Sequence, residues 1–171
     1  MGDIARGLIS VVVVAVVAVS VGACGSTERL TATELAANGN VVCADSDKKL
    51  RKVFEEELGG GGEPTPKQMQ AVLKRVVPIV EGTVTGLRML EPPKELQDRF
   101  EDALGEAEEA IVALRKGAAS GEAAKALFSA PQDPFAKANK GLESVGIGTC
   151  SQGGSAGAVD AVVGQATGRS S

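Results

Sequence analysis

The reactive side chains of this chain are three cysteines, Cys24, Cys43 and Cys150, and the sequence contains no histidine. Histidine is the usual general base of enzymes, the commonest zinc ligand and the side chain that ordinarily titrates near neutral pH. No two cysteines stand at the C-x-x-C spacing that is typical of redox and zinc sites. The sequence therefore indicates no metal and no cofactor, and we expect the protein not to be an enzyme.

Two short patterns match catalytic motifs. Gly153 to Gly157 fits G-x-S-x-G, the nucleophile turn of α/β-hydrolases, but it lies in a stretch rich in Gly and Ser rather than between a strand and a helix. Ser46 to Lys49 fits the S-x-x-K of penicillin-recognising enzymes, but the S-D-N and K-T-G motifs that accompany it are absent. Neither context supports catalysis, so we interpret both matches as coincidence.

The N-terminal segment has the layout of an export signal. A short region with one acidic and one basic residue precedes residues 7 to 27, which carry no charge and are mainly apolar. A charged start, an apolar middle and small residues at the end are typical of a secretory signal peptide. The run closes with an aliphatic residue, two small residues and a cysteine, which are Val21, Gly22, Ala23 and Cys24.

These four residues resemble the lipobox of bacterial lipoproteins. In that family the cysteine thiol receives a diacylglyceryl group, and a dedicated peptidase cuts the chain just before the cysteine. The resemblance implies that residues 1–23 are a lipoprotein signal peptide and that Cys24 is the lipidated first residue. Two or more acyl chains, at about 0.8 kcal/mol per buried methylene, hold a protein stably at a membrane. The implied location is the extracytoplasmic face of the cell membrane, with the membrane itself as a partner.

An uncleaved anchor and an ordinary buried helix are the alternatives for the apolar run. About 20 apolar residues suffice to cross a bilayer, so the length of the run allows an anchor. The small residues at its end favour cleavage. The lipoprotein and the anchor both place the rest of the chain outside the cytoplasm.

Assigning Cys24 to lipid leaves Cys43 and Cys150 as a pair. Disulfides form and persist in oxidising compartments, so we expect these two residues to be bonded to each other. Such a bond would close most of the chain into a loop and stabilise the fold by roughly 4 to 5 kcal/mol at most. The alternatives are two separate thiols, or a redox or metal pair.

The charge and aromatic content exclude a nucleic-acid partner. The formal net charge is -4, and the chain has four Phe and neither Trp nor Tyr. Because Lys and Arg are not concentrated in a stripe, no basic surface is available for phosphates, and few rings are available for base stacking.

Apolar residues recur at spacings of three and four, and no useful strand alternation appears outside the signal. This periodicity predicts helices over residues 41–58, 65–90, 93–117, 121–129 and 134–145. Thr65 and Pro66 are a typical helix start, since threonine caps the end and proline fits the first turn. Pro78 lies inside the second helix and is expected to kink or split it.

These segments predict an all-α fold, a four-helix up-and-down bundle with the second helix kinked at Pro78 and one disulfide as a clamp. In such a bundle the first helix begins and the fourth helix ends at the same pole, which brings Cys43 and Cys150 together. The expected organisation is a signal peptide (1–23), a flexible tether (24–40), the helical bundle domain (41–150) and a disordered Gly/Ser/Ala-rich tail (151–171).

Further short motifs resemble the small secreted lipoproteins of actinobacteria. They are a D-P-F-x-x-A-N segment from Asp133 to Asn139 and a G-x-x-x-C segment from Gly146 to Cys150, which accompany the lipobox and the polar tether. The resemblance implies a cell-envelope location and a helical fold, and it implies no activity.

Two functions remain as hypotheses. The first is a non-catalytic interaction module on a membrane-anchored envelope lipoprotein, with an envelope protein as the expected partner. The alternative is a carrier, in which a kink at Pro78 and the small residues Gly82 and Gly86 open the bundle core to a small apolar ligand. A connected apolar cavity of roughly 300 Å³ would favour the carrier.

Overall fold

The structure is a computed structural model that describes residues 29–60 and 62–153. The predicted lipobox and signal peptide, together with residues 154–171 of the predicted tail, lie outside this part of the chain. The described residues form six helices and no strand: α1 (Ala32–Leu58), α2 (Pro66–Arg88), α3 (Lys94–Ala118), α4 (Gly121–Phe128), α5 (Ala136–Ser144) and α6 (Thr149–Gly153). The predicted all-α fold is confirmed, whereas the predicted number of four helices is wrong.

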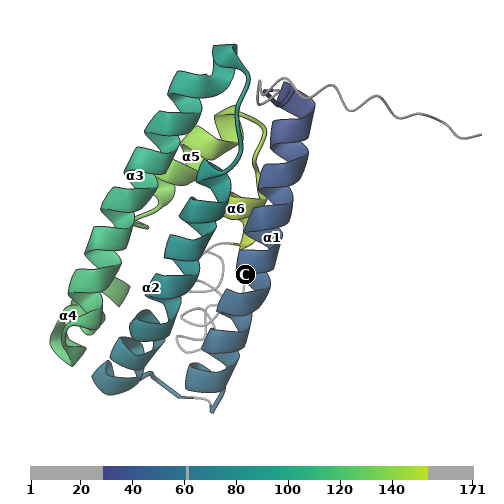
Figure 1. Cartoon of the computed structure of the whole chain (residues 1–171). Helices are drawn as coiled ribbons and strands as arrows, with labels where there is room; N and C mark the ends of the chain where they lie inside the picture. The colour runs from purple at the N-terminus through teal and green to yellow at the C-terminus, as the bar shows by residue number, and fades with distance from the viewer. Residues whose placement is uncertain (1–28, 61, 154–171) are drawn as a thin grey trace, which may run out of the picture.

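Three long helices, α1, α2 and α3, lie side by side and alternate in direction (Figure 1). The connection between α1 and α2 lies at one end of the domain, and the connection between α2 and α3 lies at the other end, beside the start of α1. There the backbone N–H of Leu30 donates a hydrogen bond of 2.9 Å to the carbonyl of Glu91. We call this end the α1-start pole.

After α3 the sequence predicts two shorter helices, over residues 121–129 and 134–145, and the structure has three, α4, α5 and α6. α4 packs against α2 and α3, α5 packs against α3, and α6 packs against α1. Pro131 and Pro134 separate α4 from α5, because proline cannot continue a helix. Gly146, with a φ of 88°, ends α5 in the left-handed conformation that glycine adopts without strain. The part of the chain after α3 therefore folds as short helices, and none of them is the full-length fourth helix of an up-and-down bundle.

The first helix begins at Ala32 and not at the predicted Val41. The hydroxyl of Thr31 accepts a hydrogen bond of 3.2 Å from the Glu34 N–H, and the Glu34 carboxylate accepts one of 2.8 Å from the Thr31 N–H. This reciprocal capping box satisfies backbone donors that the first turn of a helix leaves unpaired. Leu35 is fully buried in the core. The predicted flexible tether is therefore wrong over residues 32–40, and the predicted tail is wrong over residues 151–153, which belong to α6.

The second helix starts as predicted, with Thr65 as its cap and Pro66 as its first residue. The Thr65 hydroxyl accepts a hydrogen bond of 3.3 Å from the Gln68 N–H. Helix α2 continues through Pro78 to Arg88, so the proline does not split it.

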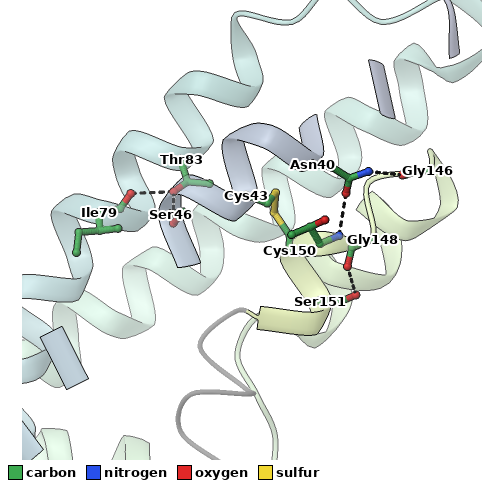
Figure 2. Close-up of a disulfide and its surroundings, with 10 residues drawn as sticks. Asn40, Cys43, Ser46, Ile79, Thr83, Gly146, Gly148, Cys150 and Ser151 are labelled. Atoms are coloured by element: carbon green, nitrogen blue, oxygen red, sulfur yellow. Dashed lines mark hydrogen bonds between the residues drawn. A yellow bond between two sulfur atoms is a disulfide. The ribbon is translucent and has the colours of Figure 1, made fainter. Parts of the chain in front are cut away.

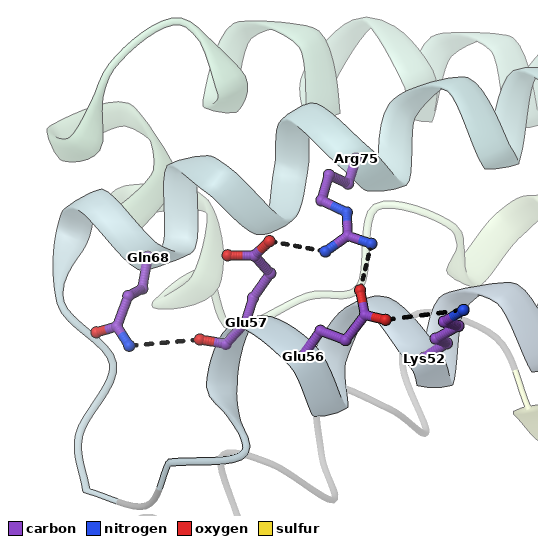
Figure 3. A network of polar contacts seen from close by, with 5 residues as sticks. All are labelled: Lys52, Glu56, Glu57, Gln68 and Arg75. Atoms are coloured by element: carbon purple, nitrogen blue, oxygen red, sulfur yellow. Dashed lines mark hydrogen bonds and ion pairs between the residues drawn. The ribbon is translucent and has the colours of Figure 1, made fainter.

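An ionic cluster joins α1 to α2 at the end opposite the α1-start pole (Figure 3). The Arg75 guanidinium donates hydrogen bonds of 2.6 Å to Glu56 and 2.8 Å to Glu57. The hydrogen bond from Arg75 lowers the pKa of Glu56, and the bonds to Glu57 and Glu56 raise the pKa of Arg75. Gln68 donates a further hydrogen bond of 3.3 Å to the Glu57 carbonyl. This bond links the end of α1 to the start of α2, on either side of the glycine-rich loop, residues 59–62.

The core is built from the inward faces of all three long helices. On α3 the apolar residues that recur at spacings of three and four are buried, at Phe100, Ala103, Ala107, Ala110 and Leu114. The largest fully buried side chains of the domain are Phe100, Leu35, Leu87, Leu104, Ile147, Val72 and Val76. Among the helices of residues 29–60 and 62–153, none has both the length and the apolar character needed to cross a membrane.

Candidate functional site

The disulfide predicted from the sequence is present, and it joins Cys43 of α1 to Cys150 of α6 (Figure 2). The two Cα atoms lie 5.0 Å apart, and 107 positions separate the residues along the chain. Cys43 is buried at 2% exposure, in a cluster that also contains Leu87 and Leu142. The bond therefore fastens the last helix of the domain to the middle of the first.

The turn after α5 leads the chain into α6, which packs against α1. Because Gly146 takes a positive φ, the chain reverses and the N–H of Ile147 donates to the Leu142 carbonyl at 2.9 Å. Ile147 is fully buried, and it packs directly over Gly39 of α1. The Asn40 carboxamide donates to the Gly146 carbonyl at 3.2 Å and accepts from the Thr149 N–H at 2.8 Å (Figure 2).

A small cavity of about 60 Å³ lies beside the disulfide. Its lining is mainly apolar, and it includes Leu50, Val80, Val84, Leu87, Phe135 and Leu142. Asp47 also lines it. Its Oδ1 is buried without a hydrogen-bond partner in the described part of the chain, whereas its Oδ2 accepts a hydrogen bond of 2.8 Å from Arg51. A cavity of this volume holds a few water molecules and not a drug-sized ligand.

Ser46, the serine of the S-x-x-K match, is engaged inside the domain. Its hydroxyl oxygen lies 2.6 Å from that of Thr83, and Thr83 donates 2.9 Å to the Ile79 carbonyl (Figure 2). Because Thr83 has a single hydroxyl proton, Ser46 is the donor between the two hydroxyls. Lys49 lies on the exposed side of α1, 2.6 Å from Asp45. Ser46 and Lys49 therefore do not contact each other, which agrees with the interpretation of the S-x-x-K match as coincidence.

The other catalytic match, Gly153 to Gly157, extends beyond the described residues. Within residues 29–60 and 62–153, no group of three or more Cys, Asp or Glu side chains is arranged to hold a metal ion. Asp45, which has its pKa lowered by its hydrogen bond with Lys49, sits on an open helix surface.

A second hollow lies on the outer surface, between α2 and α3. This α2–α3 groove is an open depression of about 490 Å³, and its lining residues are Glu81, Val84, Thr85, Arg88, Glu108, Ile111, Val112 and Arg115. Val84 and Ile111 form a nearly buried floor at 7% and 5% exposure, whereas Val112 is 46% exposed. The groove therefore combines a nearly buried apolar floor with one exposed valine.

Two ion pairs bridge the groove, one near each end. Arg115 donates a hydrogen bond of 2.8 Å from Nε to Oε1 of Glu81, and its Nη2 lies 2.7 Å from the same oxygen. Arg88 donates from Nε at 3.1 Å and from Nη2 at 2.6 Å to Oε1 of Glu108. Both arginines thus use the same two nitrogens on a single carboxylate oxygen. Within the described residues, Oε2 of each glutamate and Nη1 of each arginine have no partner.

The two helices contribute matching sequences to this groove. Residues 81–88 read EGTVTGLR and residues 108–115 read EEAIVALR, so Glu, Leu and Arg recur at equal spacing. Because α2 and α3 are antiparallel, the two segments are related by a local twofold axis that passes through the middle of the groove. Sequence reasoning missed this site. The available signal was the Glu and Arg seven positions apart on each helix, which places them on one face.

Comparison with protein-family models, with curated proteins and with solved structures gives no match to this chain.

Proposed function

We propose that the protein is a membrane-anchored cell-envelope lipoprotein, whose helical domain is a non-catalytic interaction module. The observation that carries the proposal is the bond between Cys43 and Cys150. This pairing is the one expected in an oxidising compartment, and it leaves Cys24 as the one cysteine available for a lipid. The lipobox resemblance at Val21, Gly22, Ala23 and Cys24 supplies the anchor.

The interaction role is supported by where the hollows of the domain lie. The inner cavity beside the disulfide has about 60 Å³, whereas the larger hollow is open to solvent between α2 and α3. Pockets for drug-sized ligands have about 300 to 1,000 Å³, so the inner cavity is too small for one and the open surface is the better candidate. The interacting face in this proposal is the α2–α3 groove.

The anchor is tested by metabolic labelling of cells that express the chain with a clickable fatty acid. We expect label on the wild-type protein and on a Cys43→Ser/Cys150→Ser variant, because neither cysteine of the disulfide is the lipidated residue. We expect none on Cys24→Ala. Label retained by Cys24→Ala would contradict the assignment, whatever the domain binds.

The alternative function is a carrier of a small apolar ligand. The apolar lining of the cavity beside the disulfide favours it, and a bend of α2 at Pro78 would widen that cavity, since a proline inside a helix removes one backbone hydrogen bond. Gly82 has nothing within 4 Å of an added Cβ, and Gly86 has only Val42 there. The volume of about 60 Å³ argues for the interaction module, because ligand pockets have at least about 300 Å³. A fluorescent apolar probe that bound in the wild type but not in a Val80→Phe variant would favour the carrier, because Val80 lines the cavity and not the α2–α3 groove.

A further inference from the structure

We propose that the α2–α3 groove is the contact surface of a symmetric homodimer, so that the partner of the interaction module is a second copy of this chain. The proposal rests on the proposed function in one respect, which is that both copies are anchored in the same membrane. It specifies the occupant of the groove, the arrangement of the two copies and the residues that meet.

The charges of the groove are complementary to themselves. Glu81 and Arg115 face each other at one end of the groove, and Glu108 and Arg88 face each other at the other end. When two such faces meet with α2 of one copy opposite α3 of the other, each glutamate lies across from an arginine of the second copy. Each end then holds four charges of alternating sign. Interfaces favour such an arrangement, because complementary charges fix register and exclude wrong partners.

The ion pairs within each copy leave polar atoms available for contacts with the second copy. Each arginine contacts one carboxylate oxygen through Nε and Nη2, and the remaining Oε2 and Nη1 atoms have no partner in residues 29–60 and 62–153. The four side chains are between 36% and 60% exposed, so a second copy can reach them. A carboxylate accepts from two arginines without losing its first partner.

The middle of the groove supplies the apolar part of the interface. Val112 stands 46% exposed between the two ion pairs, opposite Thr85 of α2, and the nearly buried Val84 and Ile111 lie beneath. In the dimer, Val112 of each copy packs against Thr85 of the other. An apolar centre inside a charged rim is the usual anatomy of a protein interface.

The anchor selects one of the two ways in which the faces can meet. A twofold axis parallel to the helices places α2 opposite α3 of the second copy and keeps both α1-start poles at the same end. A twofold axis across the helices places α2 opposite α2 and sends the two poles to opposite ends. Cys24 lies shortly before α1 in the sequence. Only the first arrangement therefore lets both lipids enter one membrane, and it is the one proposed.

Anchoring also compensates for the modest size of the surface. Copies that share one membrane meet at an effective concentration far above their average concentration, which raises the occupancy of a weak contact without new interactions. The groove joins the last turns of α2 to the C-terminal half of α3, so it lies along the side of the domain, between its two ends, where a neighbouring copy in the same membrane can meet it.

The first test measures association of the full-length chain in detergent micelles by sedimentation velocity, at concentrations up to about 1 mM, the range that tethering supplies. Glu81→Arg/Glu108→Arg makes the face wholly positive, and Arg88→Glu/Arg115→Glu makes it wholly negative. We expect the wild type to dimerise, each variant alone to associate at least tenfold more weakly, and an equal mixture of the two variants to form a heterodimer.

The folded state of these variants is checked by circular dichroism, because exposed ion pairs contribute only about 0 to 1 kcal/mol each and their loss leaves the fold intact. The matched control is Glu55→Arg/Glu143→Arg, which makes the same change in net charge at exposed positions of α1 and α5. It should dimerise like the wild type. A wild type that stays monomeric throughout, or variants that associate equally well alone and mixed, would overturn the proposal and leave the labelling test of the anchor untouched.

The second test fixes the arrangement. Thr85→Cys and Val112→Cys are made in separate chains and treated with copper phenanthroline, alone and as a mixture. The proposed dimer predicts cross-linked product in the mixture, because position 85 of one copy faces position 112 of the other. Cross-linking of Val112→Cys alone would contradict this arrangement, because that product requires α3 opposite α3.

Discussion

Asn40 and Thr149 meet across the whole folded chain: the side-chain oxygen of Asn40 accepts a hydrogen bond of 2.8 Å from the backbone N–H of Thr149, 109 positions later. The same carboxamide donates to the Gly146 carbonyl. One side chain of α1 therefore satisfies two backbone groups of the segment that carries Cys150. The segment between α5 and α6 is not helical, so Asn40 supplies hydrogen bonds that a regular helix would otherwise provide there.

Replacing Asn40 with alanine should loosen α6. The change leaves the Thr149 N–H unpaired in a partly buried position, at a cost of about 1 to 3 kcal/mol, whereas water can replace Asn40 at the exposed Gly146 carbonyl. We expect the Thr149 amide to exchange its hydrogen at least tenfold faster in native-state exchange measurements. Asn38→Ala is the matched control, because Asn38 is exposed on the same helix. Equal exchange rates in both variants would show that the disulfide alone holds α6.

Two glycines of the domain should respond in opposite ways to alanine. A Cβ on Gly39 would lie 2.7 Å from Cγ1 of Ile147, which is fully buried and cannot move aside. Gly39→Ala should therefore destabilise the domain by about 1 to 3 kcal/mol through overpacking. Gly82 is exposed in α2 with nothing within 4 Å, so Gly82→Ala should stabilise by about 0.5 to 1 kcal/mol. Urea unfolding of both variants checks this, and a stable Gly39→Ala would mean that Ile147 repacks.

The start of α1 should lose stability in acid. The Thr31 N–H, followed by the Thr31 hydroxyl, holds the pKa of Glu34 below its usual 4.5. Because the pKa is lower in the folded than in the unfolded state, the contribution is complete above about pH 4.5 and is lost as the pH falls through the lowered pKa. Glu34→Gln removes this dependence but keeps a capping side chain, as Gln68 does in α2.

Urea unfolding from about pH 7 to about pH 3 measures the effect as a difference between wild type and Glu34→Gln. This difference should shrink as the solution becomes more acidic. The control is Glu55→Gln, because the Glu55 side chain makes no hydrogen bond or ion pair in the described range. A difference that stayed constant over the pH range would exclude Glu34 as the titrating group.

The helices could be predicted from local signals, and the errors have local causes. The second helix was found because Thr65 and Pro66 mark its start. Thr31 and Glu34 form the same capping signature, but few large apolar residues follow them, so the polar composition up to Asn40 was interpreted as a tether. Composition averages over a segment, whereas the single buried Leu35 is enough to dock this turn onto the core.

The disulfide could be predicted from the sequence, whereas the groove could not. Pairing of Cys43 with Cys150 follows from cysteine count once one thiol is assigned to lipid. The meeting of Glu81 with Arg115 depends on the register of α2 against α3, which no short-range pattern fixes. Asn40 could not be predicted either, because its partners are backbone groups of a turn over 100 positions away.

The early start of α1 sets the height at which the domain stands. The chain from Cys24 to Arg29 covers roughly 18 Å at full extension, and Arg29 already donates 2.9 Å to the Pro92 carbonyl at the α1-start pole. With lipid on Cys24, this pole therefore cannot rise further than that above the bilayer surface. Helix α1 then carries the opposite end about 40 Å outward. If α1 stands upright on an anchored chain, neighbours in the membrane would face the α2–α3 groove, and the end of the domain between α1 and α2 would lie farthest from the bilayer.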